Sequence, residues 1–168
     1  MKAIYLTGFM GVGKTTVGKA LADNLNLNVI DLDDYIEEKL SADIPSIFQK
    51  KGEAYFRDQE QLALQELPTS DLVITTGGGV VLREVNRSHM KANGIVIHLE
   101  ATVDTIFDRL SEGGRPLANG KSKREIAQMV DERKPMYLDA HASIETDKKS
   151  IEEIVEEIST WIKSVEIA

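Results

Sequence analysis

The sequence contains no cysteine, so neither disulfide bonds nor thiolate metal ligands can contribute to its fold or chemistry. No apolar run approaches the roughly 18 residues that a membrane-spanning helix needs. The first apolar run, residues 3–6, ends at Gly8 and does not resemble a signal peptide. Internal repeats, low-complexity tracts and a proline- or serine-rich linker are also missing. We therefore expect one globular domain over residues 1–168, located in the cytoplasm.

The formal charge of −8 argues against a nucleic-acid partner and against a membrane-binding surface. The charge is unevenly spread, because residues 109–124 contain five basic side chains and one acidic one. A basic segment in an acidic chain indicates an anionic ligand, and a solvated basic loop is the open alternative. No pattern predicts a large apolar surface, so we expect a monomer.

Short apolar runs alternate with helical patterns along the chain. The expected strands are residues 3–6, 28–32, 72–75, 95–99 and 143–145. The first four are aliphatic or β-branched runs without alternation, as expected for strands that are buried on both faces. Strand–helix alternation predicts an α/β fold in which helices cover both faces of a parallel sheet.

Several helices carry start or stop signals. Ser122 with Glu125 and Ser150 with Glu153 have the spacing of capping boxes. A helix over residues 83–93 is expected to end at Gly94 as its C′ residue. After Ser150, apolar residues at helical spacing predict a face that packs on the sheet, with Trp161 on or beside it. This face consists of Ile151, Ile154, Val155, Ile158, Ile162 and Val165.

The segment from Gly8 to Thr15, Gly-Phe-Met-Gly-Val-Gly-Lys-Thr, satisfies the phosphate-binding pattern G-x-x-x-x-G-K-[ST]. Its glycines let backbone amides point at phosphate oxygens, Lys14 adds a positive charge near the β- and γ-phosphates, and the Thr15 hydroxyl can ligate Mg²⁺. The guanine-reading motif N-K-x-D is absent, because its nearest counterpart at residues 146–149 lacks the asparagine and the later aspartate. A small-molecule kinase is therefore favoured.

Three further groups of residues point to an acceptor site. Asp31 and Asp33 follow a strand, where one could hold Mg²⁺ and the other could accept a proton; a helix N-cap at Asp33 or Asp34 is the alternative. Arg57 and Glu60 have helical i,i+3 spacing within a predicted helix over residues 52–67, so they can pair, as ordinary surface residues also do. Residues 77–79 are three glycines after a strand, which allow a ligand to approach the backbone or form a plain turn.

These motifs, in this order and over nearly the whole chain, resemble those of shikimate kinases. Besides the loop, the aspartates, the Phe56-Arg57-x-x-Glu60 segment and the glycines, they include Arg115-Pro116-Leu117 and Arg133-x-x-x-Tyr137. The resemblance implies a three-layer P-loop kinase fold with a five-stranded parallel sheet, and a mobile lid at about 111–124. It also implies a phosphotransferase that moves a phosphoryl group from ATP to the 3-hydroxyl of shikimate, in chorismate and aromatic amino-acid biosynthesis.

Residue roles follow from the same resemblance. Asp33, Lys14 and Arg115 are expected to act in catalysis. Shikimate is expected to bind in a region at about 33–60 and through Asp33, Arg57, Gly78, Gly79 and Arg133. ATP is expected to contact Gly11, Val12, Gly13, Lys14, Thr15, Thr16, Arg109 and Arg115. Thr15 and Asp31 are expected to hold the Mg²⁺ cofactor.

The residues themselves agree with a shikimate acceptor, since two arginines suit a carboxylate and Asp33 suits hydroxyl groups. Arg115 lies beside Gly113 and Gly114, which suits a lid with glycine hinges. The chain departs from the family at residues 147–150, Asp-Lys-Lys-Ser, where a proline or arginine is common. The alternatives are a gluconate-type or other small-metabolite kinase and a nucleotide-binding module without catalytic activity.

Overall fold

The computed structural model describes residues 1–112 and 120–167. The strands are β1 (Ala3–Thr7), β2 (Asn28–Asp31), β3 (Leu72–Thr75), β4 (Gly94–Glu100) and β5 (Ala142–Glu145). The helices are α1 (Lys14–Leu25), α2 (Leu32–Leu40), α3 (Ile44–Lys51), α4 (Glu53–Glu66), α5 (Glu84–Asn93), α6 (Val103–Glu112), α7 (Lys123–Tyr137) and α8 (Ile151–Ile167), with a 3₁₀ turn, η1, at Val80–Leu82. None of the helices in the described ranges combines the length and hydrophobicity that crossing a membrane requires.

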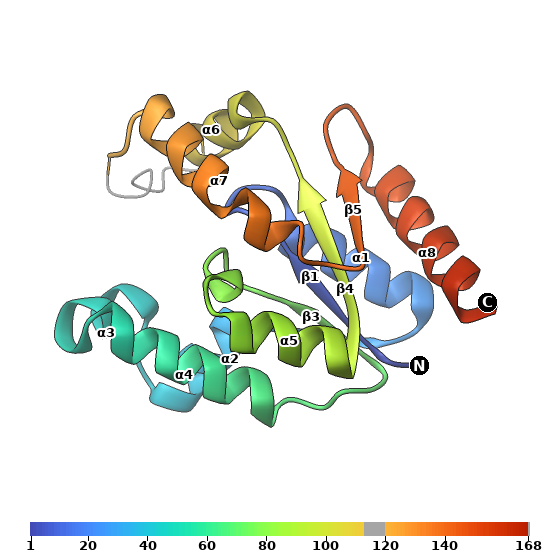
Figure 1. The fold of residues 1–168 in the computed structure, drawn as a ribbon, viewed down its shortest axis with the longest axis horizontal. Helices are drawn as coiled ribbons and strands as arrows, with labels where there is room; N and C mark the ends of the chain where they lie inside the picture. Colours follow the sequence, from blue (N-terminus) through green and yellow to red (C-terminus); the bar gives the residue numbers. More distant parts are fainter. Residues whose placement is uncertain (113–119, 168) are drawn as a thin grey trace.

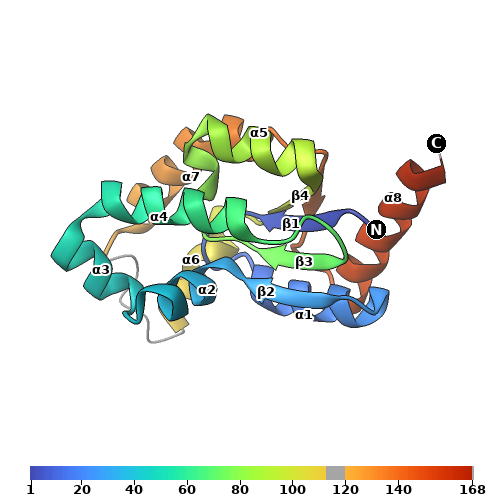
Figure 2. The ribbon, with the colours of Figure 1, turned by 90° about the horizontal axis from the view of Figure 1, so that it is seen from below.

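The five strands form one parallel sheet in the order β2-β3-β1-β4-β5 (Figure 1). Right-handed crossovers put a connecting helix on one face when the chain moves one way along the sheet, and on the other face when it returns. The step from β1 to β2 accordingly places α1 on one face, where α8 packs beside it. The later steps run in the opposite direction and place α4, α5 and α7 on the other face (Figure 2).

The sheet separates two apolar clusters, because successive side chains of a strand point to opposite faces. On β1, Ala3 and Tyr5 join the cluster under α4, α5 and α7, whereas Ile4 and Leu6 join the cluster under α1 and α8. All four side chains are fully buried. The core therefore lies on both sides of β1, and this central strand carries the phosphate-binding loop at its carboxyl end.

All five predicted strands are present, with ends that differ by a single residue or none. The prediction that the first four are buried on both faces is wrong for β2, where Asn28 is exposed and the side chain of Val29 is 37% exposed. The reason is that β2 forms an edge of the sheet and pairs only with β3. Apolar composition does not reveal how many neighbours a strand has.

Two helix predictions also need correction. The helix α5 ends at Asn93 as predicted, but Gly94 is not a left-handed C′ residue, because its φ of −160° is extended and it opens β4. A side chain there would meet Ala3 O at 2.4 Å, so close strand packing requires the glycine. On α8, Val165 is 41% exposed although it belongs to the predicted apolar face, because the last turn of the helix projects beyond the sheet (Figure 2).

Helix capping agrees largely with the sequence. Ser122 and Glu125 form the complete predicted capping box at the start of α7. At the start of α8, the Ser150 hydroxyl accepts from the Glu153 amide at 3.1 Å.

Candidate active site

The loop between β1 and α1 opens a cavity at the carboxyl end of the sheet. Gly11 and Gly13 have φ values of 83° and 101°, which side chains rarely permit, so the glycines let the chain curl into α1. The cavity has a volume of about 290 Å³ and lies beside the first turn of α1. It is lined by Met10, Gly11, Gly13, Lys14, Thr15, Thr16, Asp31, Asp33, Thr76, Gly77 and Gly78. A helix N-terminus that faces a cavity in this way suits an anion.

Lys14, the first residue of α1, is the buried cation of this cavity. Its ammonium donates to the carbonyl oxygens of Gly8 and, at 3.2 Å, Phe9. Burial lowers the pKa of Lys14 to about 8, against the opposing effect of the Asp33 and Asp31 carboxylates. At neutral pH the side chain is still mostly charged, so it can bind phosphate.

Asp31 links the three elements that meet at the cavity. One carboxylate oxygen accepts from Thr75 Oγ1 at 2.8 Å on β3 and lies 3.4 Å from Thr15 Oγ1 on α1. The other accepts from the amide of Asp34 at 3.1 Å, which makes Asp31 the N-cap of α2. The N-cap suggested for Asp33 or Asp34 is therefore wrong. Because Asp31 takes the capping role, Asp33 is left available for another one.

Asp33 projects into the same cavity from the first turn of α2. Its Oδ1 atom is buried and has no hydrogen-bond partner within the described residues. Burial raises the pKa of Asp33 to about 6, and the negative charges of Asp31 and Glu60 add to the effect, while Lys14 opposes it. An unpartnered carboxylate with a pKa near neutrality is suited to accept a proton.

Arg57 is fixed against the glycine segment by a buried partner. Its guanidinium lies 2.9 Å from the carboxylate of Glu60, which is fully buried on the same helix, α4. It also lies against Gly79, where a Cβ atom would be 2.3 Å from Nη2, so a side chain at this position would displace it. Burial raises the pKa of Glu60, although the charge of Arg57 opposes this. The predicted pair exists, and it is not an ordinary surface pair.

Arg133 approaches the glycine segment from α7. Its Nη1 lies 3.4 Å from the carbonyl oxygen of Gly78, and its guanidinium is 5.8 Å from the centroid of the Phe9 ring in the phosphate-binding loop. One turn later, the Tyr137 hydroxyl donates to the same Gly78 oxygen at 2.5 Å. The glycine segment therefore lies between Arg57 on one helix and Arg133 on another, beside the cavity that holds Asp33.

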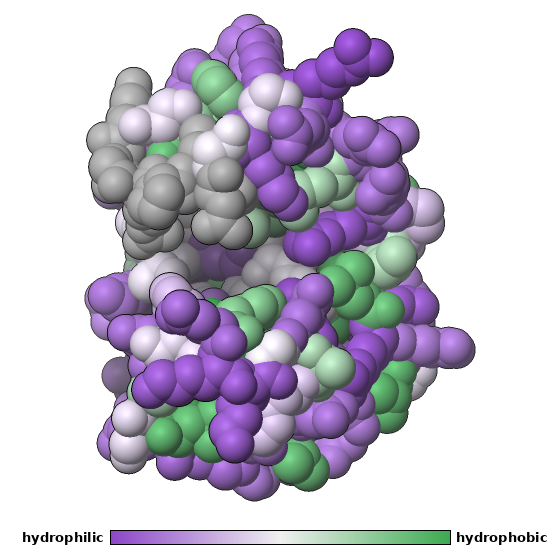
Figure 3. Space-filling view, turned by 90° about the vertical axis from the view of Figure 1, so that its left-hand side faces the viewer, coloured by the Kyte–Doolittle hydropathy of each residue, from purple (hydrophilic) through white to green (hydrophobic). Residues whose placement is uncertain are grey.

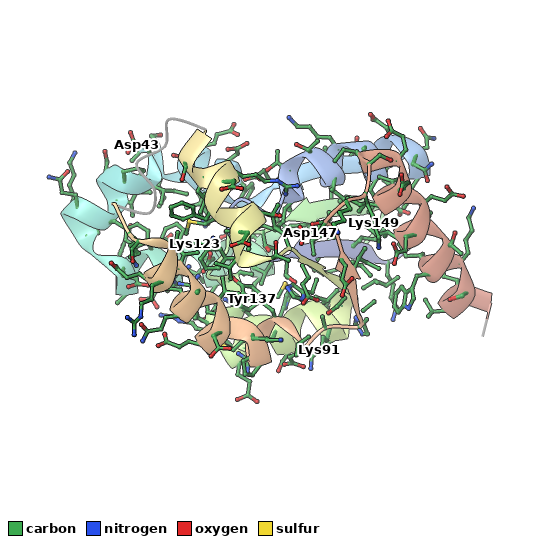
Figure 4. The ribbon with its side chains drawn as sticks, turned by 90° about the horizontal axis from the view of Figure 1, so that it is seen from above. Asp43, Lys91, Lys123, Tyr137, Asp147 and Lys149 are labelled. Carbon is green, nitrogen blue, oxygen red and sulfur yellow. The ribbon has the colours of Figure 1, made fainter. Side chains whose placement is uncertain are left out.

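Arg109 lies against the phosphate-binding loop from α6. Its Nη1 donates to the carbonyl oxygens of Gly11 at 3.2 Å and Val12 at 2.9 Å. The Val12 side chain is buried in the core, so only its backbone can face a ligand. In the loop between β5 and α8, Asp147 (Figure 4) accepts at 2.9 Å from the amide of Thr102, the residue before α6.

Half of the predicted lid at 111–124, residues 113–119, lies outside the described residues. Arg115, expected to contact phosphate, is one of them.

Figure 3 shows the molecular face on the side of α3 and α7, and this face is hollowed across its middle.

The sequence did not identify Thr75, which binds the Asp31 carboxylate. Tyr137 is part of the Arg133-x-x-x-Tyr137 motif, but its contact with the Gly78 carbonyl was not predicted. Thr75 ends β3 just before the three glycines, and this position was the signal that could have identified it.

The chain matches the family model for shikimate kinase over residues 10–163. The shikimate kinase of Bacillus cytotoxicus is 47% identical over 165 residues, covering 98% of this chain and 100% of the relative. That of Sulfurihydrogenibium sp. is 45% identical, covering 97% and 99%. This chain belongs to the shikimate kinase family.

Solved structures of the family share the fold. Shikimate kinase from Acinetobacter baumannii, in complex with shikimate, has a TM-score of 0.92 at 36% identity, covering 100% of this chain and 96% of that one. The enzyme from Aquifex aeolicus has a TM-score of 0.84 at 34% identity, covering 99% of both chains. The resemblance noted in the sequence and the predicted α/β fold are thus confirmed.

Proposed function

We propose that this chain transfers the γ-phosphoryl group of ATP to the 3-hydroxyl of shikimate, giving shikimate 3-phosphate and ADP. The observation that carries the proposal is the shared cavity of about 290 Å³, in which the unpartnered carboxylate of Asp33 faces the phosphate-binding loop. Shikimate kinases perform this step on the route to chorismate and the aromatic amino acids. Membership of the family supports the choice of acceptor over gluconate.

For ATP, the backbone from Gly11 to Thr16 is proposed to bind the phosphates, with Lys14 beside the β- and γ-phosphates. Arg109 would flank the adenine from α6. Arg115 is proposed to contact the transferred phosphoryl group; this role rests on its motif alone.

For the metal, the Thr15 hydroxyl and the Asp31 carboxylate are the proposed Mg²⁺ ligands, directly or through water. Mg²⁺ is usually bound by one or two carboxylates together with substrate phosphates, and these two oxygens, 3.4 Å apart beside the phosphate-binding loop, fit that pattern. When bound, the ion would neutralise charge on the phosphates.

For shikimate, Arg57 and Arg133 are proposed to bind the carboxylate as charge-assisted donors. Asp33, Gly78 and Gly79 would contact the hydroxyl groups. In the reaction, the 3-hydroxyl oxygen attacks the γ-phosphorus in line while Asp33 accepts its proton. The bond from the γ-phosphorus to the bridging oxygen breaks, and ADP leaves with that electron pair. Lys14 stabilises the charge on the transferred group.

A coupled assay of ADP release tests this function with three reactions: ATP with shikimate, ATP with gluconate, and ATP alone. We expect release with shikimate far above the other two. Release with gluconate would assign a different metabolite kinase, and ATP binding without acceptor-dependent release would assign a nucleotide-binding module.

A further inference from the structure

The carbonyl oxygen of Gly78 is held by two donors from α7. The Tyr137 hydroxyl lies 2.5 Å away, whereas Arg133 Nη1 lies at 3.4 Å, near the limit of a hydrogen bond. Arg133 has five N–H donors, so it can bind the acceptor carboxylate while its long contact with Gly78 stays weak. Tyr137 is therefore the main donor to this carbonyl.

A fixed Gly78 carbonyl also fixes the amide of Gly79. In a trans peptide the C=O of one residue and the N–H of the next lie in one plane and point in opposite directions. Within the described residues, the Gly79 N–H has no acceptor, whereas the next amide along the chain, that of Val80, donates to Gly77 O. The Gly79 N–H is therefore unpaired among these residues although Gly79 is buried against the Arg57 guanidinium, and the direction of this N–H depends on what holds Gly78.

The Tyr137 ring is itself immobilised by packing. It stacks on His98 of β4 with ring centroids 5.1 Å apart and an interplanar angle of 3°. His98 Nδ1 lies 3.1 Å from Ser143 Oγ on the neighbouring strand β5. Both rings are buried, and Figure 4 shows Tyr137 at the end of α7, toward the middle of the molecule. The sheet thus determines where the hydroxyl lies.

We propose that Tyr137 is a positioning residue for the acceptor: its hydroxyl holds the Gly78–Gly79 peptide so that the Gly79 N–H points at a shikimate hydroxyl. This inference rests on the proposed function. It assigns a role to the last residue of the Arg133-x-x-x-Tyr137 motif. It also implies that His98 of β4 and Ser143 of β5, which hold the Tyr137 ring, help to orient the acceptor.

The test is Tyr137→Phe, which keeps the stacked ring and removes only the hydroxyl. We expect the KM for shikimate to rise roughly tenfold, as the loss of one buried hydrogen bond implies, while the KM for ATP stays within about twofold. Tyr5→Phe is the matched control, because Tyr5 is also buried and its hydroxyl has no partner within the described residues. It should change neither KM.

Thermal unfolding and calorimetric binding of shikimate accompany the kinetics. An unchanged shikimate KM in a folded Tyr137→Phe protein would overturn the positioning role while leaving the proposed function intact. Equal rises in both KM values would also overturn it, as they indicate general loosening. If the unmodified protein releases no ADP with shikimate, both the proposed function and the positioning role of Tyr137 fail.

Ser143→Ala is a second variant, which removes the contact that holds His98. It should raise the shikimate KM by a smaller factor than Tyr137→Phe.

Discussion

The carboxylate of Asp33 is held where its charge is disfavoured. Its surroundings are buried, Asp31 and Glu60 are also negative, and one of its oxygens has no partner. A surface carboxylate with a pKa near 4 would accept a proton from an alcohol poorly. The same burial that raises the pKa therefore makes Asp33 a stronger base.

Replacing Asp33 with asparagine should abolish most of the turnover. The amide is similar in size but cannot accept the proton, and losing a general base typically costs about 10²- to 10⁴-fold. We expect a fall of this size in kcat, measured by ADP release with shikimate, while ATP affinity by calorimetry changes little. Near-normal turnover would exclude Asp33 as the base.

The pKa of Asp33 also predicts the acid limb of the pH profile. The base must be deprotonated, and its pKa is raised to about 6. The kcat/KM should therefore fall about tenfold for each pH unit below this value, and stay constant from there up to about pH 8, where Lys14 begins to lose its charge. A profile that stays flat down to about pH 4.5 would show that no group of this kind limits the reaction.

At the level of elements, α4 presents two carboxylates to Arg57 with opposite exposure. Glu60 lies 2.9 Å away and is fully buried, whereas Glu53 lies 3.5 Å away with its side chain 60% exposed. A buried charge-assisted contact fixes a guanidinium, whereas an exposed pair contributes little. Glu60 should therefore control the direction in which Arg57 binds the acceptor.

Glu60→Ala should raise the KM for shikimate roughly 10- to 100-fold, the range expected for a lost hydrogen bond to a charged group. The KM for ATP should not change, because Arg57 does not line the phosphate cavity. Glu53→Ala removes the same charge from the same helix and should leave both constants within about twofold. Equal effects of the two substitutions would contradict the inference that Glu60, and not Glu53, orients Arg57.

The strands were predictable from local sequence because aliphatic and β-branched runs mark them directly. The edge position of β2 was not predictable, since it depends on which strands pair. The same limit applies at Gly94, which follows the end of α5 as predicted but is required there by the close approach of β1. Local patterns identify elements, and pairing decides what each residue in them contacts.

For the whole molecule, the candidate site could be predicted as a set of motifs but not as an arrangement. The phosphate loop, Asp33, Arg57 and Arg133 were all identified in the sequence. The contacts of Asp31 with Thr75 and of Tyr137 with Gly78 join residues 44 and 59 positions apart. Only the order of the strands brings such residues together at the carboxyl end of the sheet. The monomeric state stays a prediction.

The buried carboxylate should also affect the stability of the whole molecule. The pKa of Asp33 is about 6 in the folded protein and near 3.8 when the chain is unfolded. Between these values the folded state binds more protons, so this group lowers the free energy of unfolding as pH rises from about 4 to 6. Above about pH 6 this decrease in the free energy of unfolding is constant, and below about pH 4 it disappears.

Asp33→Asn should therefore stabilise the protein at about pH 8, by on the order of 1 to 2 kcal/mol after allowing for residual solvent contact. At about pH 4 the gain should disappear. Urea unfolding at both pH values measures the difference. Asp23→Asn, at an exposed position on α1, removes the same charge and should show little gain at either pH. A variant that is inactive yet more stable would show that the fold tolerates an unfavourable charge at this position because the reaction requires it.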